Sequence, residues 1–331
     1  MMEEEKITPE PIMKMIWGMW SFRTLYAAVD LEIFTKIDNG LNTSEKIAIE
    51  LDTKNETVER ILNACVTLEL LNKDDEIYNN TSVASEFLVK GKQEYYGDMV
   101  IMFGTKDALK DLKEAVLTSS PVIKGLTERM EDTEQAKIFT RAMHNNAMGP
   151  AMVLSKKFDF SKYRKLLDLG GGSGAFSIVL SKQYPNLTAT VFDLPNVCSV
   201  AKEFIKEADI ESRVEILDGD FFKDELPKDY DIVLLSQILH SWSVEENKTL
   251  LKKVYDCLPE NGILIINEFL LNENKTGPLF PALFALNMLV QSEGGNAYTE
   301  GEIKGWLEDV GFEYIETIKL TGPVTALVVK K

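Results

Sequence analysis

The hydrophobic pattern of the chain changes character about halfway along. In the first 160 residues, apolar side chains recur every three or four positions, as at Ile12, Met15 and Met19, which is typical of helices. From Lys165 onward, short apolar runs alternate with helical stretches at spacings of roughly 20 to 30 residues. Strands that alternate with helices predict a parallel sheet with helices on its faces. We therefore expect a helical N-terminal part followed by an α/β domain.

Residues 1–100 are predicted to form a helical domain. Pro9 and Pro11 open a first helix, and the next helix carries the apolar residues between Leu25 and Leu31. The polar residues that are candidates to cap the following two helices are Thr43, Ser44, Asn55 and Thr57.

A small hairpin is predicted where Asp74 and Asp75 separate two short apolar segments. Helices followed by a hairpin are typical of a winged helix, a fold that often binds DNA. The candidate recognition helix, residues 57–71, contains one arginine and two glutamates, which does not suit a phosphate backbone. We expect a winged-helix-like packing and dimerisation domain here.

Residues 101–160 are predicted to form a helical connector over the active site. Its most regular feature is a stripe of large apolar side chains, at Phe139, Met143, Met148 and Met152. Such a stripe is usually core, although a connector that lies over a cleft can also contact a ligand.

Residues 161–331 are predicted to form a Rossmann-like seven-stranded domain. Its first five strands correspond to the apolar runs KLLDLG, TATVFDLP, RVEILDGD, DIVLLSQ and GILIINEF. The last two, EYIETIKLTG and PVTALVVKK, are expected to pair with each other around residues 321–323.

A glycine-rich loop, DLGGGSG, follows the first of these strands and precedes a helix. Glycines allow a tight turn and a close approach of the backbone to a ligand. The loop, which includes Gly170, Gly172 and Gly174, suits a dinucleotide or S-adenosylmethionine equally well.

Acidic residues close to the strand ends help to separate these two ligands. Asp168 precedes the loop, where a carboxylate suits the amino-acid part of S-adenosylmethionine better than an anionic pyrophosphate. Asp193 can accept hydrogen bonds from ribose hydroxyls in either ligand. Asp220 can accept from an adenine amino group, and Phe221 offers its ring an apolar face. The alternative is that each acid caps a helix.

His240 is the candidate general base. It follows the fourth strand at the ligand-binding edge, and a histidine side chain can in general take a proton from a phenol or enol near neutral pH. Glu268 ends the fifth strand at the same edge and can orient the imidazole. His144, in the connector, is a candidate to line the acceptor pocket.

Composition and net charge limit the classes of partner and the cellular compartment that we expect for this protein. The net charge of −17 disfavours nucleic acid as a partner. The three cysteines are far apart and form no CxxC pair, and no Asp/His cluster has ligand spacing, so a metal is not suggested. The acidic N-terminus lacks the features of a signal peptide, and the apolar runs are too short to span a bilayer. We expect a cytoplasmic protein.

Taken together, these motifs resemble the class I S-adenosylmethionine-dependent O-methyltransferase family, of the plant caffeic-acid and acetylserotonin type with a bacterial and archaeal natural-product branch. The segments LLDLGGGSGAFS, FDLP, GDFF, ILHSW and LPENG occur in the family's order, with FTRAMHNNAM before them and NMLVQSEGG after them. The resemblance implies a homodimer whose N-terminal domains exchange helices, with S-adenosylmethionine as cofactor and His240 as general base.

The resemblance and the loop chemistry together define three sets of expected site residues. The cofactor-binding set is Asp168, Gly170, Gly172, Gly174, Asp193, Leu194, Asp220, Phe221 and Ser236. The acceptor-pocket set is Met143, His144, Trp242, Asn287 and Met288. The catalytic set is His240 and Glu268.

Three positions depart from the family pattern. Ser241 stands where the family has an aspartate, Ala297 replaces a glutamate expected beside the base, and Tyr298 replaces an arginine. We expect methyl transfer to a hydroxyl of a small aromatic acceptor. The alternatives are C- or N-methylation, a non-catalytic cofactor-binding regulator and a nicotinamide-dependent oxidoreductase.

Overall fold

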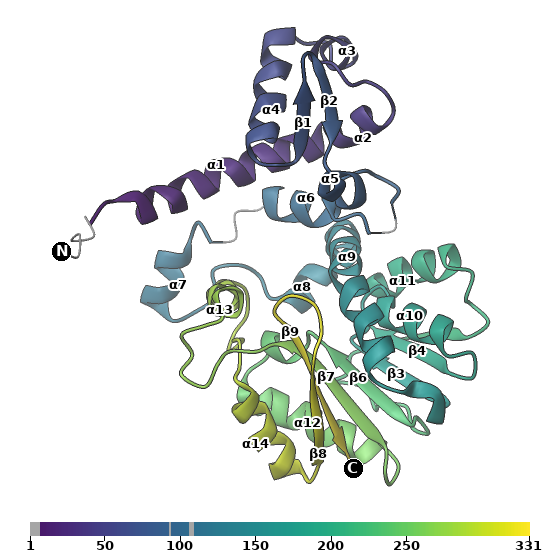
Figure 1. Cartoon of the computed structure of the whole chain (residues 1–331). Coiled ribbons are helices and arrows are strands. Elements are labelled where there is room, and N and C mark those ends of the chain that lie inside the picture. Colours follow the sequence, from purple (N-terminus) through teal and green to yellow (C-terminus); the bar gives the residue numbers. More distant parts are fainter. Residues whose placement is uncertain (1–6, 93, 106–108) are drawn as a thin grey trace, which may run out of the picture. The chain divides into compact units, whose positions relative to one another are not determined.

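The computed structural model describes residues 7–92, 94–105 and 109–331 (Figure 1). The chain divides into two compact units, Met1–Lys106 and Asp107–Lys331. The first contains helices and a two-stranded sheet, and the second contains a seven-stranded sheet with helices.

The described elements of the first unit follow the predicted order of helices and then a hairpin. They are α1 (Glu10–Asp30), α2 (Ile33–Asp38), α3 (Ser44–Glu50), α4 (Asn55–Thr67), β1 (Leu71–Asp74), β2 (Ile77–Asn80), α5 (Ser82–Phe87) and α6 (Gly97–Thr105). The hairpin predicted around Asp74 and Asp75 is confirmed, because β1, which ends at Asp74, pairs antiparallel with β2 across a turn that contains Asp75.

Two details of the helix prediction for this unit are wrong. The first two predicted helices form one helix, α1. Neither the proline nor the glycine among its 21 residues ends it. The predicted cap of α4 is also absent, because its N-cap is Lys54, which makes no side-chain cap bond. The cap at Thr43 is confirmed, and its hydroxyl accepts from the Lys46 backbone N–H at 3.3 Å.

The described elements of the second unit alternate between strand and helix after a helical start. Its helices are α7 (Leu112–Thr118), α8 (Leu126–Met130), α9 (Thr133–Lys157), α10 (Ala175–Gln183), α11 (Pro195–Glu207), α12 (Val244–Cys257), α13 (Leu279–Gln291) and α14 (Glu300–Val310), with short 3-10 turns η1 (Phe160–Lys162) and η2 (Leu239–Ser241). Its strands are β3 (Lys165–Leu169), β4 (Thr188–Asp193), β5 (Val214–Asp218), β6 (Ile232–Ser236), β7 (Ile263–Phe269), β8 (Glu313–Lys319) and β9 (Val324–Lys330).

The seven strands lie in the order β5-β4-β3-β6-β7-β9-β8. The first five are parallel, and β9 runs antiparallel to both of its neighbours. The chain first moves outward from β3 to β5 and then crosses back to β6, so strand order reverses between β3 and β6. In open α/β sheets, ligands bind at the carboxyl ends of the strands beside such a reversal.

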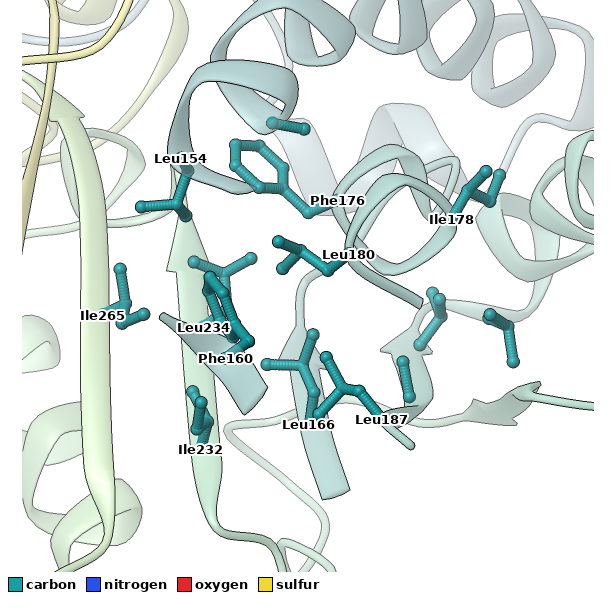
Figure 2. Close-up of a cluster of buried hydrophobic side chains, with 14 of the residues drawn as sticks. Leu154, Phe160, Leu166, Phe176, Ile178, Leu180, Leu187, Ile232, Leu234 and Ile265 are labelled. Carbon is teal, nitrogen blue, oxygen red and sulfur yellow. The ribbon is translucent and has the colours of Figure 1, made fainter. Parts of the chain in front are cut away.

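Alternate residues of the strands pack on opposite faces of the sheet. Leu166 and Leu234 belong to one core, with residues of α9, α10 and α11, and Figure 2 shows this cluster. Leu167 and Leu235 belong to the other core, with residues of α12 and α14. The period-two alternation of each strand therefore places helices on both faces, as the strand–helix pattern predicts.

The first part of the predicted helical connector, residues 101–160, contains more than one helix. α6 ends at Thr105 and α7 begins at Leu112, and residues 106–108 of the connector lie outside the described residues. The three cysteines are free and buried. Within the described ranges, no helix combines the length and the apolar character needed to cross a bilayer.

Candidate active site

The glycine loop lies between β3 and α10, at the carboxyl edge of the sheet. Gly170 and Gly172 have φ values of +70° and +58°, a region that side chains with a Cβ rarely adopt. A Cβ on Gly170 would lie 2.4 Å from a methyl carbon of Ile238, whereas the space around Gly172 is open within 4 Å. The loop therefore turns tightly at Gly170 and presents bare backbone to the space beside Gly172.

Asp168 is buried beneath this loop. Its Oδ2 accepts from the Ser177 hydroxyl of α10 at 2.7 Å, while its Oδ1 has no hydrogen-bond partner within the described part of the chain. Burial raises the pKa of Asp168 to about 6, because it disfavours the charged form. The carboxyl group supports the loop and retains one oxygen for a further donor.

Asp193 joins β4 to the glycine loop. Its Oδ2 accepts from the Gly172 backbone N–H at 2.8 Å, and its Oδ1 accepts from the Leu194 N–H at 2.7 Å. Burial raises its pKa to about 6 despite these two bonds. The alternative that it caps a helix does not hold, because Leu194 is the N-cap of α11.

Asp220 lies in the turn after β5, two residues beyond the end of the strand at Asp218, so the prediction that it ends the strand is wrong. Its Oδ1 accepts from the Phe222 N–H at 2.9 Å, and its Oδ2 pairs with Lys223 at 2.9 Å. Burial opposes ionisation, but the bonds from Lys223 and Phe222 hold the pKa of Asp220 below its usual value. The carboxylate is therefore charged at neutral pH.

A pocket of about 500 Å³ lies beside this turn. It is lined by Thr127, Met130, Glu131, Leu194, Pro195, Asn196, Asp218, Gly219, Asp220, Lys223 and Asp224. Pockets that bind small molecules are of this size. Two of its lining residues, Leu194 and Asp220, belong to the predicted cofactor-binding set, and the mixture of apolar and acidic groups suits a nucleoside.

The end of β6 carries Ser236 and a polar network that sequence reasoning missed. The Ser236 hydroxyl accepts from the side-chain amide of buried Asn267 at 2.9 Å, and the backbone carbonyl of Asn267 accepts from the Gln237 backbone N–H at 2.7 Å. Gln237 has a φ of +57°, and its side-chain oxygen accepts from Asn146 of α9 at 3.2 Å. The signal for this network was Asn267 itself, a polar residue inside the apolar run of β7.

His240 and Glu268 form a buried pair. His240 Nδ1 lies 2.9 Å from Glu268 Oε2, and its backbone N–H donates to Glu268 Oε1 at 3.3 Å. Glu268 is 2% exposed and His240 is 9% exposed. The imidazole also contacts the rings of Phe269 and Phe284, at centroid distances of 6.1 and 4.8 Å. The structure thus brings together the two predicted catalytic residues in an apolar environment.

His144 lies beside the glycine loop. Its Nδ1 forms a hydrogen bond of 2.8 Å with the Ser173 hydroxyl, and its ring stacks on Phe204 of α11 at a centroid distance of 3.8 Å. Burial and nearby Arg141 lower the pKa of His144 to about 4, so the ring is neutral at physiological pH. These contacts connect His144 to the predicted cofactor-binding segment.

Trp242 contacts another predicted cofactor-binding segment, the turn after β5. Its ring packs edge-on against Phe221 and Phe222, at centroid distances of 6.0 and 4.6 Å. Both His144 and Trp242 are predicted beside the acceptor; in the structure His144 contacts the glycine loop and α11, and Trp242 contacts the turn after β5.

The remaining acceptor-pocket residues come from two helices. Asn287 and buried Met288 lie on α13, and half-buried Met143 lies on α9. The same helix α13 contributes Phe284 to the surroundings of His240, and Phe280 stacks on Phe284 at 5.7 Å. Phe280 and Phe284 were missed, since their spacing is that of an ordinary apolar helix face.

The segment that departs from the family pattern packs against the His240 turn. The Asn296 N–H donates to the His240 carbonyl at 2.9 Å, and neighbouring Ala297 is 1% exposed. The Tyr298 hydroxyl donates to the Trp242 carbonyl at 2.6 Å. Tyr298 therefore holds this segment against the turn by a neutral hydrogen bond.

Comparison with known protein families identifies both units. Residues 13–90 match the O-methyltransferase dimerisation domain, and residues 105–313 match the O-methyltransferase domain. Within the described residues, no group of three or more His, Cys, Asp or Glu side chains gathers in a way that could hold a metal.

Individual proteins are similar over nearly the whole chain. The sequence is 36% identical to 3-hydroxy-5-methyl-1-naphthoate 3-O-methyltransferase of Streptomyces sahachiroi, over 92% of this chain and 90% of that protein. It is 31% identical to the acetylserotonin O-methyltransferase of Bos taurus, over 95% of each chain. The crystal structure of human N-acetylserotonin methyltransferase in complex with S-adenosylmethionine matches with a TM-score of 0.90 at 26% identity, covering 100% of this chain and 99% of that one. The chain therefore belongs to the O-methyltransferase family, and it is an S-adenosylmethionine-dependent O-methyltransferase with a Rossmann-like catalytic domain and an N-terminal dimerisation domain.

Proposed function

We propose that this enzyme methylates a hydroxyl group of a small aromatic acceptor, with His240 as the general base. The observation that carries the proposal is the 2.9 Å contact between His240 Nδ1 and Glu268, at the same sheet edge as the glycine loop.

The pair determines which imidazole nitrogen accepts a proton. An ionised carboxylate only accepts hydrogen bonds, so Nδ1 carries the hydrogen and Nε2 keeps its lone pair. Nε2 is then available to take the proton of an acceptor hydroxyl as that oxygen attacks. Glu268 stabilises the imidazolium that results and is itself held by the backbone N–H groups of His240 and Phe269.

The residues around the loop and the pocket fit S-adenosylmethionine. When bound, this cofactor supplies an electrophilic methyl group. We assign Asp193 to the ribose hydroxyls and Asp220 with Phe221 to the adenine. Asp168, the glycine loop and Ser236 are assigned to the remaining part of the cofactor, beyond its ribose and adenine. The open space at Gly172, the free Oδ1 of Asp168 and the pocket of about 500 Å³ support this placement.

The surroundings of His240 favour an aromatic acceptor. Phe269, Phe280 and Phe284 pack edge-on or stacked with one another, and Phe284 contacts the imidazole. Aromatic rings favour such contacts with a planar, apolar ligand. The naphthoate named for the relative from Streptomyces sahachiroi is an acceptor of this kind. Met143, Asn287 and Met288 are assigned to the acceptor side, whereas His144 and Trp242 are assigned to cofactor support.

We propose that the helical connector covers the active site. The proposal concerns those described residues of 101–160 that belong to the second unit. The long helix α9 of the connector contacts the glycine loop through His144 and the end of β6 through Asn146. We propose that the winged-helix-like first unit forms the homodimer, because α1 exposes a row of apolar residues, including Ile12, Met15 and Met19.

The substitution His240→Ala tests the proposed base. We expect the variant to bind S-adenosylhomocysteine within about threefold of the wild type, while kcat with a hydroxynaphthoate or another active phenol falls by about 10²- to 10⁴-fold. Calorimetry measures the first quantity and product formation from labelled S-adenosylmethionine the second.

Ser241→Ala is the matched control, since it alters the adjacent side chain of the same turn and should retain turnover. Normal turnover by His240→Ala would show that another group takes the proton. Loss of S-adenosylhomocysteine binding by His240→Ala would instead show that His240 belongs to the cofactor site.

A further inference from the structure

The turn after β5 receives hydrogen bonds from a lysine on a different part of the chain. Lys253, on α12, donates to the backbone carbonyls of Phe221 at 2.6 Å, Asp224 at 2.7 Å and Phe222 at 3.3 Å. An ammonium group has three N–H donors. All three therefore find acceptors on one turn, about 30 residues away in sequence.

The turn has internal bonds that make it a single rigid piece. The Asp220 N–H donates to the Asp224 carboxylate at 2.7 Å, and the Asp224 N–H donates to the Asp220 carbonyl at 2.8 Å. A Cβ on Gly219 would lie 2.5 Å from the Phe192 ring, so the start of the turn is also tightly packed. Hydrogen bonds to the carbonyls of residues 221–224 therefore also restrain the position of Asp220.

We infer that Lys253 is a positioning residue for the nucleoside part of the cofactor. It binds the carbonyls of Phe221, Phe222 and Asp224, and thereby fixes the position of the Asp220 carboxylate, which lines the 500 Å³ pocket, and of the neighbouring Phe221. This role rests on the proposed placement of the adenine beside Asp220 and Phe221.

The charge of Lys253 suits this position. The turn contains the acidic side chains of Asp220 and Asp224, and Asp218 ends β5 just before it; all three line the pocket. A cation bonded to the turn's carbonyls reduces the mutual repulsion of these carboxylates. Hydrogen bonds from an ionised donor are also about twice as strong as neutral ones. An apolar side chain of similar length would fill the space but leave three carbonyls without this donor.

The neighbouring Lys252 provides a matched control. It lies on the same helix and carries the same charge, but it pairs with Asp256, one turn further along α12. Lys253→Met and Lys252→Met therefore change the net charge and the helix equally, and only the first removes the donors of the turn.

The experiment measures the Kd of each full-length variant for two probes by calorimetry. S-adenosylhomocysteine contains the nucleoside and the amino acid, whereas 5′-methylthioadenosine retains only the nucleoside. We expect Lys253→Met to raise the Kd for both probes by the same factor, about tenfold, and Lys252→Met to leave both within twofold. Lys253→Arg retains a charged donor and should give intermediate values. It replaces Lys253→Met if circular dichroism shows that the methionine variant is not folded.

Two results would overturn the inference. One is an unchanged Kd for both probes in a folded Lys253 variant. The other is a loss confined to S-adenosylhomocysteine, which would place the effect at the amino acid. Asp220→Ala separates this inference from the proposed site: if Asp220→Ala weakens binding and the Lys253 variants do not, only the role of Lys253 fails. If none of them weakens binding, the placement of the adenine fails as well.

Discussion

His144 and His240 are the only histidines in the sequence, and their partners differ in kind. His240 faces a carboxylate, which favours a hydrogen on Nδ1 and leaves Nε2 for proton transfer. His144 faces a serine hydroxyl and a phenylalanine ring, with Arg141 nearby, so nothing there stabilises a positive charge. The two histidines therefore have different surroundings: a carboxylate beside His240, which supports its proposed role as base, and a hydroxyl and an aromatic ring beside the neutral His144.

The pH dependence of stability should show the burial of His144. Its pKa is lowered to about 4 in the folded protein, while the unfolded chain titrates near 6.5. Between these values the unfolded state binds more protons, so the stabilisation present above pH 6.5 is lost as the pH falls. His144→Asn should remove this loss.

At pH 7.5 the free energy of unfolding of the wild type should exceed that of His144→Asn by a certain amount. We expect this difference to decrease by about 1–2 kcal/mol when the pH is lowered from 7.5 to 5. Urea unfolding at the two pH values measures it. Ser173→Ala keeps the titrating ring and should show the wild-type dependence. An advantage that does not change with pH would mean that His144 titrates normally.

At the scale of elements, the site depends on how the sheet is assembled. β3, β4, β6 and β7 end at one edge, and they carry the glycine loop, Asp193, Ser236 and Glu268 to that edge. Between the helices of the two faces, the central strands are fully buried, as at Leu234 of β6. A rigid sheet of this kind holds side chains from distant segments in a constant arrangement.

The substitution Leu234→Ala should therefore be costly. It removes a fully buried side chain from the core shown in Figure 2, and we expect the free energy of unfolding to fall by roughly 3 kcal/mol. Leu217→Ala is the control, because this leucine of β5 is 42% exposed and should cost less than about 1 kcal/mol. Urea denaturation of both variants measures the difference, and equal costs would contradict the assigned burial.

At the scale of the whole molecule, the exposed apolar surface of α1 is relevant to assembly. α1 of the first unit exposes large apolar side chains over three turns, among them Met15 at 77% and Trp20 at 61%. Apolar surface of this extent on a helix marks a site of protein association. Together with the family match over residues 13–90, it supports a second copy of the chain as the partner.

Charges on this helix should disrupt the dimer. We expect Met15→Glu combined with Met19→Glu to convert the protein to a monomer, because burying two carboxylates without partners is unfavourable. Size-exclusion chromatography with light scattering measures the mass. Ile138→Glu, at an exposed apolar position of α9, is the control and should leave the mass unchanged. A double variant that remains dimeric would place the interface elsewhere.

The sequence by itself determined the features that depend on neighbouring residues. The alternation of apolar residues predicted the strands, glycines marked the loop, and Asp193, His240 and Glu268 were identified by their places at strand ends. The tertiary structure decided what depends on contacts between distant segments. It set the strand order, the contact of His144 with the glycine loop, the contact of Trp242 with the turn after β5, and the bonds from Lys253 to that turn. The physical reason is that periodicity and turn chemistry are local, whereas strand pairing and side-chain hydrogen bonds between segments depend on the packing of the whole chain.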